Sequence, residues 1–363
     1  MKISVPQKER KEEVVRFLNK VFHKPFPRLI PSLYGKEKNT MEYHFIVEEG
    51  DELVGGICAY PEEIKVGNVV VKALGIGMVA TGKKHRGKGI MTKMVTHSLQ
   101  AYSNECDVAM LTGRRHRYEH YGFYPAGANY IYQISEKSIS NIVKGSPFTI
   151  VRAKTKEDYA MVDELTKLDL QVVSRPLATE SETLRNWYSK LYLIKNGEEV
   201  VGFASGKYFN GLCLERMFIK NGSPEDYASA VYAYRKQKKL PLLRVEVLPT
   251  ECAFKEAMAR GSEEYMINSH VKYYVFSYKR LVEKLLAIGL EQGSLRNSEC
   301  IVEIEGREKM KIVTTATSFV VEETTDEPNL ILSEQNAIAS LLGAEETIVK
   351  GMGKFALRHS DFI

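Results

Sequence analysis

The feature that most constrains the fold is a long strand-like run that ends in a basic, glycine-rich loop and leads directly into a helix. Residues 69–81 are largely apolar and rich in β-branched side chains, which predicts a strand. Residues 82–89 then read Gly-Lys-Lys-His-Arg-Gly-Lys-Gly. Apolar side chains follow with helical spacing at Ile90, Met94, Val95, Leu99 and Tyr102. This order predicts an α/β fold of mixed sheets, with a ligand site where the loop meets the helix.

The loop has the chemistry of an anion site. Gly87 and Gly89 have no side chains, so their backbone N–H groups can approach an anion closely. The helix that begins at Ile90 adds free N–H groups and the positive end of its dipole. Further positive charge comes from Lys83, Lys84, Arg86 and Lys88. Together these groups predict a pyrophosphate site.

Two common nucleotide motifs fit this loop poorly. Residues 82–88 satisfy the spacing Gly-x4-Gly-Lys, but a P-loop needs Ser or Thr next, to hold magnesium, and position 89 is Gly. A dinucleotide fingerprint Gly-x-Gly-x-x-Gly is absent, because Gly75 and Gly77 lie inside the preceding strand. The loop is therefore interpreted as neither a P-loop nor a dinucleotide site.

The first segment, residues 1–146, has the order strand, helix, hairpin, long strand, glycine loop, helix, strand. A parallel step from strand 69–81 to strand 107–112 across one helix would open a crevice at the strand ends, where ligands tend to bind. The other elements expected here are strands 1–5, 43–47, 53–60 and 130–134 and helices 8–22 and 90–102.

The second segment, residues 147–278, repeats this order and indicates an internal duplication. It lacks a glycine loop after its strand 211–219, so we interpret it as a structural unit without a cofactor. Its other expected elements are strands 148–153, 191–194, 200–207 and 240–247 and helices 156–168, 180–190, 224–238 and 251–259.

The third segment, residues 279–363, predicts an α+β unit. Strand 273–276 leads into it, and its expected elements are helices 279–288 and 334–342 and strands 300–305, 309–314, 318–323 and 329–332. The chain ends on Asp361-Phe362-Ile363, an apolar ending where frayed, hydrophilic residues are usual, and we expect it to dock as a last strand.

Composition excludes several classes of protein. No run approaches the roughly 20 apolar residues of a membrane span, and the charged N-terminus is unlike a signal peptide, so we expect a cytoplasmic protein with no membrane partner. The net charge of +5 is spread over 363 residues and indicates no nucleic-acid partner. Binding through residues 83–88 alone would lack the broad basic and aromatic face that nucleic acids need. Five cysteines, far apart and without a Cys-x-x-Cys pair, indicate neither a metal site nor disulfides.

Two stretches resemble a known family. Lys84-His-Arg-Gly-Lys-Gly89 resembles the Arg/Gln-x-x-Gly-x-Gly/Ala signature of GNAT acetyltransferases, with Lys in place of the first Arg or Gln. Arg117-Tyr118-Glu-His-Tyr-Gly-Phe123 resembles a segment of the enhanced intracellular survival family within that superfamily. The resemblance covers the whole chain. It implies a catalytic GNAT domain (1–146), a degenerate GNAT-like domain (147–278) and a sterol-carrier-protein-like domain (279–363).

The resemblance also implies an activity: an N-acetyltransferase that uses acetyl-CoA. It places the pantetheine on the backbone of Gly77, Met78 and Val79. It places the pyrophosphate on His85, Arg86, Gly87, Lys88, Gly89 and Ile90, and it makes Gly113 and Arg114 line the cofactor. Tyr118 becomes the general acid, since a tyrosine with a pKa near 10 keeps its proton at neutral pH. The general base becomes the C-terminal carboxylate of Ile363. Family members commonly end on an aromatic residue, so the final Ile363 leaves the register of this carboxylate open by one residue. Asp361 is the nearest alternative carboxylate.

The acceptor and the oligomeric state are also expectations from this resemblance. The resemblance implies a small primary amine as acceptor, aminoglycoside-like or lysine-like, and a homo-oligomer, either a trimer or a hexamer. Acidic residues such as Glu37, Glu42 and Glu62 are candidates to line a site for a cationic amine. His116 and His120 flank Tyr118 and are expected to face solvent. The alternative function is a catalytically silent protein that binds acetyl-CoA or a lipid on the same fold.

Overall fold

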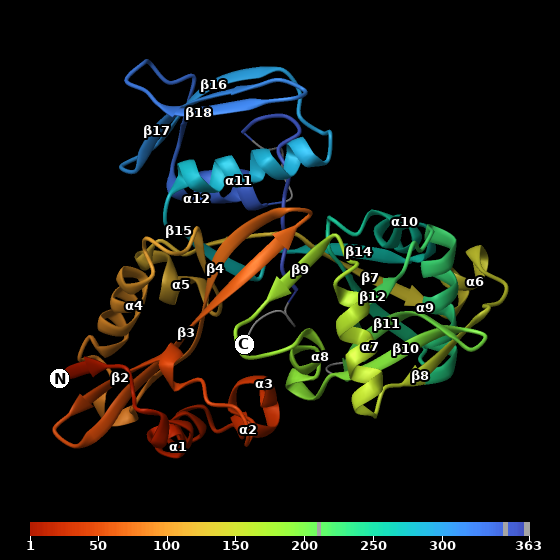
Figure 1. Ribbon diagram of the computed structural model, residues 1–363, viewed down its shortest axis with the longest axis horizontal. Coiled ribbons are helices and arrows are strands. Elements are labelled where there is room, and N and C mark those ends of the chain that lie inside the picture. Colours follow the sequence, from red (N-terminus) through yellow and green to blue (C-terminus); the bar gives the residue numbers. More distant parts are fainter. Residues whose placement is uncertain (209–211, 344–347, 359–363) are drawn as a thin grey trace.

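The computed structural model describes residues 1–208, 212–343 and 348–358, which form three sheets with helices packed between and around them (Figure 1). The predicted mixed α/β class is confirmed. No helix in these ranges is both long enough and apolar enough to span a membrane.

The first sheet contains the long strand that the sequence predicts. Its order is β1 (Lys2–Ser4), β2 (His44–Glu49), β3 (Glu52–Val66), β4 (Val69–Thr81), β5 (Val108–Thr112), β15 (Val271–Val275) and β6 (Tyr124–Ala126), with β9 (Gln171–Ser174) paired to β3. The pair β4–β5 is parallel, and the other pairs in this sheet are antiparallel.

Different helices cover the two faces of this sheet. On one face lie α1 (Lys11–Phe22), α2 (Phe26–Leu29) and α3 (Pro31–Tyr34), which share a core with Tyr60 of β3. On the other face lies α4 (Ile90–Ala101), which packs against Leu74 and Ile76 of β4. The helix approaches closely because Gly55 of β3 has no side chain; a Cβ there would lie 2.6 Å from Cγ2 of Ile90.

The second sheet, at the right of Figure 1, repeats the organisation of the first. An antiparallel run leads through a helix to a strand that pairs in parallel, here from β12 through α9 to β13. The sheet order is β14 (Glu264–Asn268), β7 (Asn129–Ser135), β13 (Leu242–Val247), β12 (Leu212–Ile219), β11 (Glu199–Tyr208), β10 (Lys190–Asn196) and β8 (Phe148–Arg152). Its helices are α6 (Glu136–Ile142), α7 (Lys156–Thr166), α8 (Glu180–Thr183), α9 (Pro224–Lys238) and α10 (Cys252–Gly261).

The two sheets exchange strands. β7, which precedes residue 147, pairs with strands of the second sheet, whereas β9 and β15, which follow it, pair with strands of the first. The sheets therefore do not follow the ranges 1–146 and 147–278 strand for strand, and the functional division at these boundaries stays a prediction.

Two strands of the second segment, β9 and β14, were not expected, and one predicted helix was wrong. The helix expected over 180–190 ends at Thr183 and is followed by a 3-10 turn, Asn186–Tyr188, in which Trp187 and Tyr188 have φ of +55° and +63°. Two consecutive residues in the left-handed region cannot continue an α-helix.

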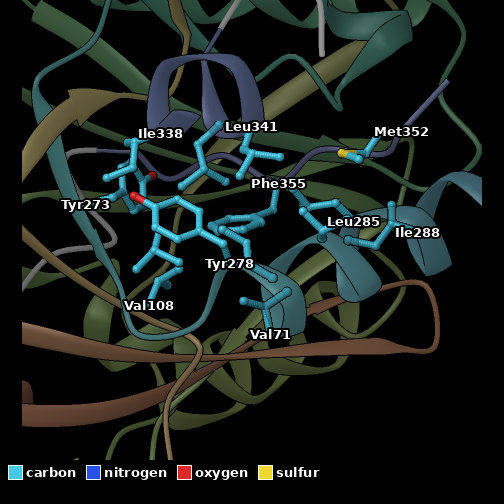
Figure 2. Packing of buried hydrophobic residues seen from close by; sticks show 14 of the residues in the cluster. Val71, Val108, Tyr273, Tyr278, Leu285, Ile288, Ile338, Leu341, Met352 and Phe355 are labelled. Carbon is cyan, nitrogen blue, oxygen red and sulfur yellow. The ribbon is translucent and has the colours of Figure 1, made fainter. Parts of the chain in front are cut away.

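The third unit consists of α11 (Tyr278–Glu291), β16 (Ser298–Ile304), β17 (Glu308–Thr314), β18 (Phe319–Glu323), β19 (Leu330–Leu332) and α12 (Glu334–Leu342). α11 and α12 lie between its sheet and the first sheet (Figure 1). Figure 2 shows the shared core, in which Val71 and Val108 of the first sheet meet Leu285 and Ile338. Phe355 joins this core, with its ring centroid 6.2 Å from that of Tyr273. The resemblance of this unit to sterol-carrier proteins stays a prediction.

The chain end differs from the expected docked strand over the residues that the structure describes. Residues 355–358 are buried but pair with no strand among the described residues. Asp361 and Ile363 lie outside the described residues.

Candidate functional site

The predicted crevice forms where β4 and β5 part. The two strands pair over only three positions, with Ala73, Leu74 and Gly75 opposite residues 108–110. Beyond Gly75, β4 continues beside β3, while β5 stays paired with β15. A pocket opens at the parting, lined on one side by residues 75–78 of β4 and on the other by Thr112.

A β-bulge in β4 lies at the mouth of this crevice. Gly77 pairs with Cys58 and Ala80 pairs with Gly56, so one residue of β3 opposes both Met78 and Val79. Met78 has a φ of +52°, an uncommon value for a side-chain-bearing residue. A bulge takes backbone N–H and C=O groups out of the ladder. The segment to which the family resemblance assigns the pantetheine, Gly77–Val79, is therefore the segment where the strand's regular pairing breaks.

The glycine loop leads from β4 to α4 and is open to solvent. Gly82 donates its N–H to the carbonyl of Val54 at 2.8 Å, which ties the loop's start to β3. Gly87 and Gly89 have φ of +80° and +73°, and a Cβ at either would meet no described atom within 4 Å. These glycines are therefore required by backbone conformation and not by lack of space.

The helix start itself is uncovered. Gly89 is the N-cap of α4, and no side chain among the described residues caps the helix there. Ile90 is buried and anchors the first turn, while Arg86 and Lys88 are exposed beside it. The result is a set of helix N–H groups with positive charge around them, the arrangement that binds phosphate groups.

The side chain of His85 points away from this opening. It is buried, and its Nε2 lies 3.2 Å from a carboxylate oxygen of Glu49, which also lies 3.2 Å from Nζ of Lys88. Only the main chain of His85 is therefore placed to contribute at the turn. The Lys88–Glu49 ion pair and the His85–Glu49 contact hold the loop against the β2–β3 hairpin.

Tyr118 stands at the end of α5 (Arg115–Tyr118), shortly after β5. Its ring packs against Gly113, where a Cβ would lie 2.8 Å from Cε2 of the tyrosine, and edge-to-face with Phe123 at 6.3 Å. Burial raises the pKa of the Tyr118 hydroxyl, against a smaller lowering by Arg117. The side chain is thus fixed in place and keeps its proton at neutral pH. Gly113 and Arg114 are both exposed between β5 and α5.

The histidines beside Tyr118 behave as expected from the sequence. His116 and His120 are both exposed. The His120 ring contacts that of the neighbouring Tyr121 in a tilted arrangement, with ring centroids 3.9 Å apart. Neither position resembles that of an oriented catalytic base.

The pocket at the strand parting has walls that sequence reasoning missed. Phe22, Lys24 and Phe26 come from the end of α1 and the start of α2, and Trp187 comes from the second segment. Trp187 is the single tryptophan of the chain, which is the one signal that could have drawn attention to it. Because Trp187 lies far from β4 in the sequence, the sequence does not show that both line the same pocket.

One of the three acidic candidates lines the pocket. Glu62 lies on β3, fully buried, with its carboxylate 3.1 Å from Nε of Arg175. Glu37 and Glu42 are exposed and do not line the pocket.

The Glu62–Arg175 pair starts a series of buried ion pairs between the two sheets. Arg175 also lies 3.3 Å from Glu180, Glu180 pairs with Arg216, and Arg216 lies 2.9 Å from Asp169. Paired charges of this kind are costly to bury but much more costly to leave single. The series therefore fixes residues 175–180 against β3.

The last described residues run through the protein between the two sheets. The N–H of Ala356 donates to Gln171 of β9 at 3.2 Å, and the carbonyl of Leu357 accepts from Asn129 of β7 at 2.9 Å. Arg358 is buried and pairs with Glu251. The chain is thus directed into the interior up to the last residue that the structure describes.

Comparison with known proteins agrees with this geometry. Residues 2–126 match the family model of the acetyltransferase (GNAT) domain. No curated protein matches the chain. Residues 2–126, the N-terminal part of the chain, therefore carry a GNAT acetyltransferase domain.

Solved structures share the fold over almost the whole chain. A GCN5-related N-acetyltransferase from Anabaena variabilis is 15% identical, with a TM-score of 0.68 over 92% of this chain and 88% of that one. A GCN5-related N-acetyltransferase from Kribbella flavida is 14% identical, with a TM-score of 0.67 over 93% and 88%. Eis1 from Mycobacterium abscessus is 13% identical, with a TM-score of 0.68 over 95% and 90%. At these identities the likeness establishes the fold alone.

The raised pKa of Tyr118 can be measured directly. Burial disfavours the charged phenolate, so we expect the hydroxyl to ionise with a midpoint above its usual value of about 10. The difference in phenolate absorbance between wild type and Tyr118→Phe, followed against pH, isolates this one group. The same difference in denaturant should return to about 10. A folded-state midpoint at or below that value would contradict the assignment of a buried, protonated hydroxyl.

Proposed function

We propose that the protein is an N-acetyltransferase that transfers an acetyl group from acetyl-CoA to a small primary amine. The observation that carries the proposal is the bulged end of β4, which opens a crevice and leads into an uncapped helix start with two left-handed glycines. The GNAT family match over residues 2–126 supports the same reaction class.

The residues present fit acetyl-CoA. The backbone of Gly77, Met78 and Val79 at the bulge would hold the pantetheine arm. The turn from His85 to Ile90 would hold the diphosphate through main-chain N–H groups, with Arg86 and Lys88 adding charge. Gly113 and Arg114, exposed after β5, would line the far side. Bound there, acetyl-CoA supplies an activated acetyl thioester.

The chain must then solve two proton problems: the departing sulfur gains a proton and the attacking amine loses one. Tyr118 is proposed as the general acid. Its hydroxyl is protonated at neutral pH, and its ring is held against Gly113 at the end of the strand that borders the crevice. Donating that proton to the sulfur favours release of the product.

The proposed general base is the C-terminal carboxylate of Ile363, with the side chain of Asp361 as the alternative. Support comes from the buried course of residues 355–358, which lie between the sheets up to the last described residue. A carboxylate removed from bulk water accepts a proton more readily, because burial disfavours its charge.

Three further features belong to the proposal by family resemblance. The acceptor is an amine of the aminoglycoside or lysine type or another small amine, the protein assembles as a trimer or hexamer, and it acts in the cytoplasm. A sterol-carrier-like role for residues 279–363 would be that of a scaffold, in keeping with the core that this unit shares with the first sheet.

The glycine turn can be tested with a matched pair of substitutions. Gly89→Ala and Gly197→Ala both place a side chain at positive φ in open space, so they impose a similar backbone strain. Only Gly89 lies at the proposed diphosphate site. We expect Gly89→Ala to weaken acetyl-CoA binding by about tenfold or more, measured by calorimetry, and Gly197→Ala to leave it unchanged. Equal affinities in the two variants would remove the turn from the site.

Tyr118→Phe tests the general acid. The ring is kept and the proton is lost, so we expect kcat to fall by about 100-fold or more, with little change in acetyl-CoA affinity. Tyr121→Phe is the control, because it removes a nearby hydroxyl that is hydrogen-bonded to Thr92 at 2.8 Å. Release of free CoA thiol in the presence of primary amines provides the assay. Wild-type turnover in Tyr118→Phe would disprove the role. Binding of acetyl-CoA without turnover of any amine by wild type would favour the silent binding protein instead.

The role of the C-terminal carboxylate can be tested by shortening or extending the chain at its end. Deletion of Ile363, or a tag appended after it, should lower kcat far more than it lowers acetyl-CoA affinity. A tag of equal length before the exposed Met1 should change neither. Asp361→Asn separates the two candidate bases, since it leaves the terminal carboxylate intact. Unchanged turnover with a C-terminal tag would exclude the terminal carboxylate.

A further inference from the structure

The pocket at the β4–β5 parting has a composition that bears on which amine it accepts. Its volume is about 160 Å³, below the roughly 300–1,000 Å³ of sites that enclose drug-sized ligands. Three aromatic rings contribute to its wall: those of Phe22, Phe26 and Trp187. A pocket of this size and lining suits a small molecule with an apolar body.

Two ionisable side chains line the pocket, and their situations differ. Glu62 is buried and faces the guanidinium of Arg175 at 3.1 Å, a guanidinium that it shares with Glu180. Lys24 is exposed and forms no ion pair with any described residue; its Nζ lies 4.8 Å from the centroid of the Trp187 ring. Lys24 is therefore the lining side chain whose charge no described carboxylate pairs with.

The position of Trp187 is fixed by its backbone. Trp187 and Tyr188 both occupy the left-handed region, which costs bulky residues free energy and persists only where the surroundings impose it. The preceding Asn186 is held by the hydroxyl of Ser32 at 2.8 Å, across from the second segment to α3. The indole is thus presented to the pocket as a platform on which the ammonium of Lys24 rests.

We infer that the acceptor is a small primary amine with an apolar body and a carboxylate, and that Lys24, held over Trp187, pairs with that carboxylate. This inference rests on the proposed acetyl transfer at the same site. A polycation would meet the like charge of Lys24 and compete with it for the indole face, so the inference narrows the proposed acceptors to small amines and makes polycations, the aminoglycoside type included, poor acceptors here. The second segment contributes to this selection because it provides Trp187.

The experiment compares amines that differ only in charge. 4-(Aminomethyl)benzoate and benzylamine share a ring and a primary amine, and only the first has a carboxylate; spermidine serves as the polycation. Each is assayed with acetyl-CoA by release of free thiol. We expect kcat/KM for 4-(aminomethyl)benzoate to exceed that for benzylamine by about tenfold, with most of the difference in KM, and spermidine to be the poorest acceptor.

Charge reversal assigns the preference to a residue. Lys24→Glu should abolish the preference for the carboxylate, whereas Lys20→Glu makes the same change of charge on the exposed side of α1, outside the pocket lining, and should preserve it. Calorimetry with acetyl-CoA checks that each variant is folded. Should Lys24→Glu fail to fold, Lys24→Met removes the charge but keeps the alkyl stem over the indole and serves the same comparison.

The outcomes separate the two proposals. If wild type acetylates benzylamine or spermidine as well as the carboxylate, or if Lys24 variants keep the preference, the inference is overturned while the acetyltransferase proposal stands. If wild type acetylates none of the three amines although it binds acetyl-CoA, both fail at this pocket. A carboxylate preference that Lys24→Glu or Lys24→Met removes and Lys20→Glu keeps supports the inference.

Discussion

The structure depends first on how β4 ends its pairing. Leu74 and Ile76 pack toward α4, whereas Met78 and Ala80 pack toward α1–α3, because the bulge at Met78 shifts the alternation of side chains by one residue. A single strand thereby serves two cores, and its backbone is released where β5 diverges. Without the bulge, the strand would bury Gly77–Val79 in a regular ladder. The crevice therefore forms where backbone groups of β4 leave the regular hydrogen-bonded ladder of the sheet.

A second constraint joins the two sheets across this crevice. Arg175, Glu180 and Arg216 are almost fully buried and pair in sequence, so each charge depends on the next for compensation. If one member of a buried ion pair moves away, its partner is left as an uncompensated charge in the interior. A hydrophobic contact of the same area has no such partner and could shift its position more freely. The arrangement therefore favours one relative position of segment 175–187 and β3. That position brings Trp187 to the pocket.

Local signals explain which parts of the fold could be predicted. The bounds of α9 and α12 match the expected 224–238 and 334–342, since Ser223 and Ser333 cap their first turns. β9 was missed because its partner on β3 lies about a hundred residues earlier and four residues carry little periodicity. The bulge could not be predicted from the sequence, because methionine at position 78 is an ordinary residue for a strand. The glycine turn was found because Gly87 and Gly89 show their backbone requirement in the sequence itself.

The second unit shows why the same order of elements does not give the same site. In the first unit α4 begins at Gly89 with its N–H groups uncovered by any described side chain. In the second, α9 begins at Ser223, whose hydroxyl accepts from the N–H of Asp226, while the Asp226 carboxylate accepts from the N–H of Ser223 at 2.9 Å. The helix dipole there already faces a carboxylate of its own chain, so a phosphate would meet a filled position and a like charge. The second unit contributes to the crevice instead through residues 175–187. In this segment Arg175 pairs with Glu62, and the ring of Trp187 lies next to the ammonium of Lys24.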